Sequence, residues 1–131
     1  RPALARGAVV LSDRFADSSI AYQAYGRQLD LQRVRDLNQI ATGRLTPNLT
    51  LLLDIPVREG MARARAEADD RIGMETIDFH SRVLEGYKRL AMSEPERITT
   101  IDAAQPLAAV IAAAWGILAP RLTSQGYQVG V

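Results

Sequence analysis

Three short apolar runs, separated by longer segments with helical periodicity, constrain the fold of this chain more than any other feature. We expect the runs to form strands at residues 8–12, 49–53 and 97–101. Because helices intervene between the strands, the sequence predicts an α/β fold with three layers, in which helices flank a parallel sheet. Ligands of such sheets bind beyond the carboxyl ends of the strands, so the polar residues that follow each run are candidate site residues.

The segments around these runs carry the start and stop signals of helices. We expect helices over residues 1–5, 18–25, 30–42, 56–66, 74–92 and 106–119. Asp30 is the expected N-cap of the third helix, Gly43 is its expected end, and Pro120 is expected to break the last helix. Helical spacing places Val34 and Leu37 on one buried face.

Charge and residue counts exclude several kinds of site. The formal net charge is +1, which indicates neither nucleic acid nor an anionic membrane as a partner. The chain has no cysteine and one histidine, which excludes disulfides, thiolate metal sites and histidine-based metal sites. The longest apolar stretch, residues 107–118, is shorter than a bilayer span, and the first residues are too charged for a signal peptide. We therefore expect a cytoplasmic protein.

The residues that follow the first run suit a charged substrate, and they could serve a nucleoside monophosphate. Arg14 offers a planar fork for a phosphate or a carboxylate, and Asp13 can orient an arginine or accept from a metal-bound water. Tyr22 offers a flat ring, while Ser19 and Gln23 could hydrogen-bond a base edge. A structural alternative fits the same spacing: Tyr22 in the core, a serine as the helix cap, and an ion pair between Asp13 and Arg14.

Two further sets could carry chemistry. Arg63, Arg65 and Arg71 flank a polar stretch at residues 67–73, and a mobile segment with arginines would suit phosphoryl transfer. The alternative is a solvated helix end with acidic partners at residues 67, 69 and 70. The second set is the loop after the last run, where small residues would let a flat base approach the backbone: Asp102, Ala103, Ala104 and Gln105. That loop is equally a plain strand-to-helix turn before Pro106. We expect Asp54 to have a structural role and His80 to be an ordinary histidine that binds no ligand.

At these residues the chain resembles a known family. Asp-Arg-aromatic, Asp-Ser-Ser and Ala-Tyr-Gln within residues 13–23 resemble thymidylate kinases, which phosphorylate dTMP with ATP. The resemblance continues in order through residues 26–27, 37–38, 47–51, 53–54, 70–72 and 101–103. It implies a P-loop nucleoside monophosphate kinase fold, formation of dTDP and ADP from dTMP and ATP with Mg²⁺, a role in dTTP biosynthesis, and a homodimer.

The resemblance also implies residue roles. Arg14 would contact the dTMP phosphate with Asp13 beside it near the magnesium, and Ser19 and Tyr22 would contact the thymidine. Residues 67–74 would form a lid that works with the catalytic arginines Arg63, Arg65 and Arg71. Residues 102–105 would back the ATP adenine. Gly73 departs from the family, which usually has an acidic residue there, whereas Glu75 matches a second acidic position.

One motif of such kinases is absent from these 131 residues. No Gly-x-x-x-x-Gly-Lys-Ser/Thr occurs, and the only lysine, Lys88, lies within a predicted helix. The resemblance therefore implies that residues 1–131 are the carboxyl-terminal part of one kinase domain, without its P-loop and first strands, inactive alone, with a tail at about 123–131. In the family the P-loop strand lies between those matching 8–12 and 49–53. We expect either marginal folding or direct pairing of these two strands. The alternatives are a non-catalytic nucleotide-binding or degenerate fragment and another nucleotide or deoxynucleoside kinase.

Overall fold

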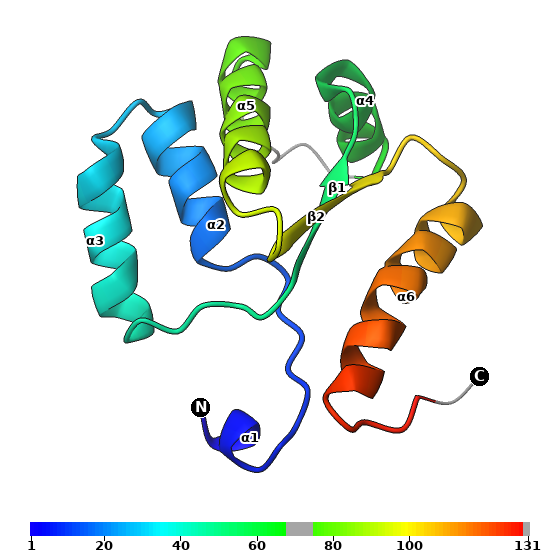
Figure 1. The fold of residues 1–131 in the computed structure, drawn as a ribbon. Coiled ribbons are helices and arrows are strands. Elements are labelled where there is room, and N and C mark those ends of the chain that lie inside the picture. The colour runs from blue at the N-terminus through cyan, green and yellow to red at the C-terminus, as the bar shows by residue number, and fades with distance from the viewer. Residues whose placement is uncertain (68–74, 130–131) are drawn as a thin grey trace.

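A two-stranded parallel sheet with helices around it forms the centre of the computed structural model (Figure 1). The structure describes residues 1–67 and 75–129, and for residues 65–67 it describes the backbone only. Strand β1 (Thr50–Asp54) pairs with strand β2 (Ile98–Asp102), in register from Thr50 beside Ile98 to Asp54 beside Asp102. The predicted parallel α/β arrangement and the second and third predicted strands are confirmed. Both strands end on an aspartate at the same sheet edge.

Seven helical segments surround this sheet in the described part of the chain. They are α1 (Pro2–Ala5), α2 (Ala16–Ser19), η1 (Ile20–Gly26), α3 (Leu31–Thr42), α4 (Val57–Glu67), α5 (Ile77–Ser93) and α6 (Leu107–Ser124). Helix α2 runs directly into η1, which has π-helical hydrogen bonding. Asp30 caps α3 by accepting a hydrogen bond from the Arg33 amide at 2.8 Å, and Gly43 ends it at a φ of 58°, as predicted.

The first predicted strand is wrong. Residues 8–12 form neither helix nor strand, and Leu11 is 84% exposed. A strand needs a neighbour to satisfy its backbone hydrogen bonds, and β1 pairs with β2 instead. The expected direct pairing of the first two strands is therefore wrong as well, and within the described residues the other edge of β1 has no strand beside it.

The last helix also differs from expectation, because it continues through Pro120 to Ser124. The amide of Gln125 closes it by bonding to the carbonyl of Leu122 at 3.0 Å. By length and composition alone, this 18-residue helix with a mean hydropathy of 1.5 could cross a membrane, and none of it is buried in the chain. The expectation that the last apolar segment is too short for a bilayer span is thus not met.

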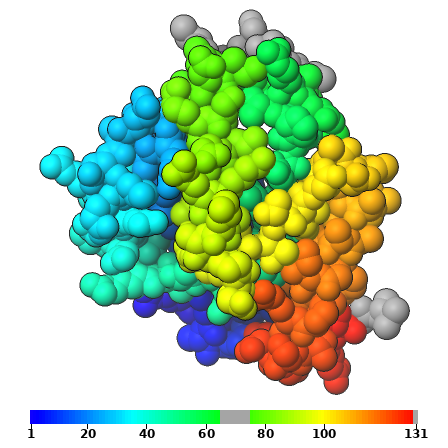
Figure 2. Space-filling view, turned by 45° about the horizontal axis from the view of Figure 1, so that its top comes forward, coloured from blue at the N-terminus to red at the C-terminus, as the bar shows by residue number. Residues whose placement is uncertain are grey.

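The buried core comes from η1, α3, α5 and the two strands. It consists of two clusters, one of Ile20, Ala24, Val34, Leu52, Leu90 and Ile98 and one of Ala21, Phe79 and Val83. Val34 is buried as predicted, but Leu37 is 66% exposed because the buried face of α3 is narrow. In Figure 2, α5 lies between the α2–α3 side and α4. Helix α6, on the other side of the sheet in Figure 1, contributes no buried residue.

Two glycines let η1 and α5 approach each other closely. A Cβ atom at Gly26 would stand 2.7 Å from the Phe79 ring, and one at Gly86 would stand 2.7 Å from the Tyr25 ring. Both distances are below any normal carbon–carbon contact, so larger residues at these positions would force the helices apart. The close contact fixes the position of η1, and of α2 that runs into it, against α5.

A buried ion pair ties the start of α2 to both strands. The guanidinium of Arg97 donates two hydrogen bonds to the carboxylate of Asp17, each 2.8 Å long, and their side chains are only 13% and 12% exposed. Thr50 adds a hydrogen bond to the same carboxylate at 3.1 Å. These bonds, opposed in part by burial, raise the pKa of Arg97. The alternative in which a serine caps this helix is wrong, because α2 begins at Ala16 and Ser18 and Ser19 lie within it.

Candidate functional site

The turn before α2 presents Asp13 and Arg14 at the surface. Both residues are exposed, and Arg14 has a φ of +63°, in the left-handed region that non-glycine residues seldom adopt. The Ser12 hydroxyl donates to the Arg14 carbonyl at 2.9 Å and so stabilises the turn. A non-glycine residue held in this region costs on the order of 1–3 kcal/mol and is typical of functional sites.

The guanidinium of Arg14 lies over the ring of Tyr22, with Cζ 5.2 Å from the ring centroid. This is a cation–π contact between an arginine side chain and an aromatic ring. The Tyr22 ring also meets the buried Phe79 ring edge to face, with centroids 6.0 Å apart. Tyr22 thus contacts both the core and Arg14, and the alternative ion pair between Asp13 and Arg14 is absent from the described residues.

The serines of α2 and the glutamine of η1 have different surroundings. The hydroxyl of Tyr87, on α5, donates to the hydroxyl of Ser18 at 2.7 Å. Ser19 is half-buried. Gln23 accepts a hydrogen bond from Arg27 at 3.2 Å, and Arg27 pairs with Glu75 at 3.6 Å. The fold therefore brings Arg14 and Tyr22 together, whereas Gln23 is engaged on the side of Arg27.

The contact of Tyr87 with Ser18 has no local sequence signal, because the two residues lie far apart in the chain. Burial raises the pKa of Tyr87, and the hydrogen bond to Ser18 opposes this shift in part. The charges of Arg14 and Asp17 also act on this pKa, in opposite directions. With its pKa raised, Tyr87 stays protonated at neutral pH and remains a hydrogen-bond donor.

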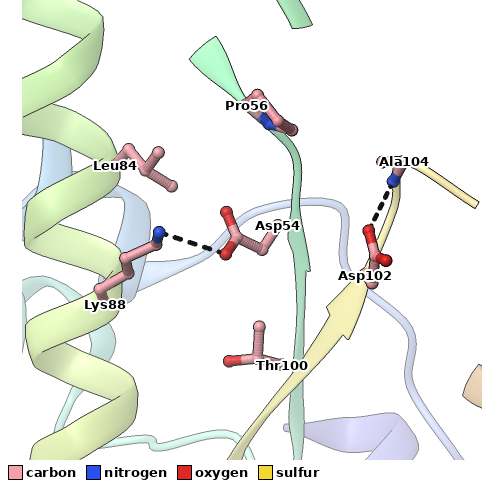
Figure 3. A pocket seen from close by; sticks show the side chains of 7 residues that line it. All are labelled: Asp54, Pro56, Leu84, Lys88, Thr100, Asp102 and Ala104. Carbon is pink, nitrogen blue, oxygen red and sulfur yellow. Dashed lines mark hydrogen bonds and ion pairs between the residues drawn. The ribbon is translucent and has the colours of Figure 1, made fainter. Parts of the chain in front are cut away.

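A second region lies at the carboxyl ends of the strands, around a cavity of about 590 Å³. Figure 3 shows Asp54 of β1 directed at Lys88 on α5, with the Lys88 Nζ atom 3.4 Å from the carboxylate. Asp102 of β2 turns instead toward its own loop. The ion pair gives the only lysine a structural partner, which was not predicted because the two residues are far apart in the sequence. Pro56, Leu84, Thr100 and Ala104 complete the lining.

Hydrogen bonds hold the loop after β2 on both sides. The Asp102 carboxylate accepts from the Gln105 side chain and the Ala104 amide, both at 2.9 Å, and these bonds lower its pKa. From α4, Arg63 donates to the Ala103 carbonyl at 3.0 Å and pairs with Glu59 at 2.6 Å. The structure thus joins one predicted catalytic arginine to the predicted base loop.

The other predicted arginines cannot be placed. Arg71 and most of the proposed lid, residues 68–74, lie outside the described residues, as does Gly73, and the side chain of Arg65 lies outside them too. His80 is half-buried with its ring 5.5 Å from the Phe79 ring centroid. In the described ranges, no three histidine, cysteine or acidic side chains gather as a metal site.

Comparisons with known proteins support the resemblance seen in the sequence. The family model described as thymidylate kinase matches residues 1–113. A thymidylate kinase of Synechococcus sp. (strain JA-2-3B'a(2-13)) is 52% identical over 121 residues, which are 92% of this chain and 58% of the relative. A thymidylate kinase of Desulfovibrio desulfuricans is 54% identical over 114 residues, 81% of this chain and 52% of the relative. The chain spans about half the length of the curated relatives it matches.

Proposed function

We propose, because this chain belongs to the thymidylate kinase family, that it provides the acceptor side of an enzyme that transfers the γ-phosphoryl group of ATP to dTMP. The products would be dTDP and ADP, in the synthesis of dTTP. The observation that carries this proposal is the exposed Arg14 guanidinium held over the Tyr22 ring. A cation beside a flat ring matches the two parts of dTMP, a phosphate and a base.

The acceptor residues would divide the work between phosphate and nucleoside. Arg14 has the planar donors that bind a phosphate through two parallel hydrogen bonds. Ser19 and Tyr22 would contact the thymidine. Gln23 would reach a base edge only after releasing its 3.2 Å hydrogen bond with Arg27.

The residues on the ATP side would act mainly through charge and position. Phosphoryl transfer needs cations around the migrating group, and Arg63, Arg65 and Arg71 would supply them from α4 and a lid at about 67–74. Residues 102–105 would back the adenine. The bond between Arg63 and the Ala103 carbonyl supports this role, because it holds one cation at that loop.

Magnesium would accompany ATP, and the chain offers one suitable group. Mg²⁺ keeps several waters and is usually held by one or two carboxylates together with substrate phosphates. Asp13 is exposed beside Arg14 and makes no ion pair within the described ranges, so its carboxylate fits that pattern. When bound, the ion would neutralise phosphate charge during transfer.

We further propose that residues 1–131 are one incomplete kinase domain of three layers, whose first strands, with the P-loop, lie outside these residues. Two observations support this: the apolar residues 8–12 pair with no strand among the described residues, and Leu107, Ile111 and Trp115 of α6 are 74%, 58% and 47% exposed. A strand beside β1 and a helix on α6 would bury both surfaces. A cytoplasmic location and a homodimer belong to the same proposal, and the exposed Leu37 and Ile40 of α3 offer apolar surface for the dimer.

Titration of the purified chain with dTMP tests the acceptor role. The wild-type chain should bind dTMP saturably, and Arg14→Gln should weaken binding about 10- to 100-fold, because a hydrogen-bonded charge contributes about 1.5–3 kcal/mol. Arg89→Gln is the matched control, since Arg89 is exposed and, among the described residues, pairs only with Glu85. Absence of binding by the wild-type chain, or an Arg14→Gln variant that binds equally well, would overturn the proposal.

A second candidate is a nucleotide-binding module without catalysis. The absence of Gly-x-x-x-x-Gly-Lys-Ser/Thr from these residues favours it. Both candidates predict dTMP binding and no dTDP formation by the chain alone. They differ once a P-loop segment is supplied, because only the kinase would then consume ATP.

A further inference from the structure

We propose that the hydroxyl group of Tyr87 is a positioning group for the nucleoside side of the acceptor site, an inference that rests on the proposed function. Tyr87 lies on α5, far from the acceptor residues in the sequence, and its hydroxyl oxygen is 2.7 Å from that of Ser18. Ser18 immediately precedes Ser19. It also lies four residues before Tyr22, so the two share one helix face.

The direction of this hydrogen bond determines what Ser18 can do. With Tyr87 as the donor and Ser18 as the acceptor, the Ser18 hydroxyl can still donate its own hydrogen to another group. Within the described residues, Ser18 donates this hydrogen to no protein group. A carbonyl oxygen of a pyrimidine base or an oxygen of its sugar is the kind of acceptor that would complete the pair.

The surroundings of Tyr87 hold its hydroxyl in place. The Tyr87 ring packs against both core clusters, which fixes the ring between η1 and α5. The ionisable groups that influence its pKa are Arg14, Asp17 and Tyr22, and Asp17 is itself held by Arg97. Because burial raises the pKa of Tyr87, the donor is retained throughout the physiological pH range.

An experiment can separate the contribution of the Tyr87 ring from that of its hydroxyl group. Tyr87→Phe keeps the packing of the ring and removes one oxygen, so a large structural effect is not expected. If the hydroxyl only stabilises the fold, dTMP affinity will follow the folded fraction. If it positions Ser18, affinity will fall in protein that is fully folded.

The test is calorimetric titration of the full chain with dTMP and with thymidine, with folding checked by circular dichroism. We expect Tyr87→Phe to weaken both ligands by a similar factor, about 3- to 10-fold, as for loss of one hydrogen bond. Ser18→Ala should lose at least as much, Ser18→Thr should retain binding, and Tyr87→Phe added to Ser18→Ala should cause no further loss. Tyr25→Phe is the matched control, because Tyr25 packs beside Gly86 and its hydroxyl bonds to no described residue.

Other outcomes would contradict the proposal. If the wild-type chain binds dTMP and Tyr87→Phe binds it with the same affinity, the positioning role is overturned and the proposed function still stands. Additive losses in the double variant, or a loss for dTMP with none for thymidine, would also overturn it. Absence of dTMP binding by the wild-type chain would overturn the proposed function and this inference together.

Discussion

Apolar side chains are buried on one side of this molecule and exposed on the other, although the sequences of the two sides are similarly apolar. On one side, α2, η1, α3 and α5 pack with the strands, and residues such as Phe79, Leu90 and Ile98 are at most 5% exposed. On the other side, Leu11 within residues 8–12 is 84% exposed, and Ile111 on α6 is 58% exposed. Apolar content is therefore not what separates the two sides. The packed side has partners within the chain, and the open side lacks them.

Helices α5 and α6 show the difference most directly. Helix α5 has one apolar face and buries Phe79, Val83 and Leu90 with it. Helix α6 is apolar on most of its surface, yet buries none of its residues. A helix that is apolar all round is normally enclosed by protein or lipid. We take α6 as the surface that the proposed P-loop part of the domain would cover.

Breaking the buried ion pair should have the largest effect on the packed side. Arg97→Ala leaves the Asp17 carboxylate buried without its cation, and we expect the free energy of unfolding to fall by about 3–5 kcal/mol. Urea denaturation followed by circular dichroism measures this. Arg89→Ala removes a pair whose side chains are 62% and 55% exposed, and should cost about 0.5 kcal/mol or less. Equal losses in the two variants would contradict the assignment of the first pair to the packed side.

A pair of glycine substitutions should sharpen the comparison with a smaller effect. Gly86→Ala places a Cβ atom 2.7 Å from the Tyr25 ring and should destabilise the chain by about 1–3 kcal/mol. Gly116→Ala on α6 meets no atom within 4 Å and should stabilise the helix by up to about 1 kcal/mol. The measurement is the urea concentration at the unfolding midpoint of each variant, compared at an unchanged m-value. If both substitutions shifted the midpoint in the same direction, the two sides would not differ as described.

Local signals predicted the parts of the fold that depend on neighbouring residues. The two paired strands, the Asp30 cap and the Gly43 helix end follow from residue type and spacing. The prediction of a strand at residues 8–12 was wrong because a strand also requires a partner. The predicted end of the last helix was wrong because the helix accommodates Pro120.

The candidate site shows the same limit. Arg14 and Tyr22 were found from their own stretch of sequence, and the fold brings them together. The partners Arg97 for Asp17, Tyr87 for Ser18 and Lys88 for Asp54 come from distant segments. Only the packing of α5 and β2 against α2 and β1 reveals them, because such pairs leave no periodic pattern in a single sequence.

Phosphoryl transfer by a fused protein tests the central claim most directly. The part of the Synechococcus relative that precedes the matched region would be joined before Arg1, and dTDP formation from dTMP and ATP would be measured. We predict that the fusion forms dTDP, that the 131-residue chain alone forms none, and that Arg14→Gln strongly reduces the rate of the fusion. A folded fusion that binds ATP and dTMP but forms no dTDP would contradict the account, as would dTDP formation by the chain alone.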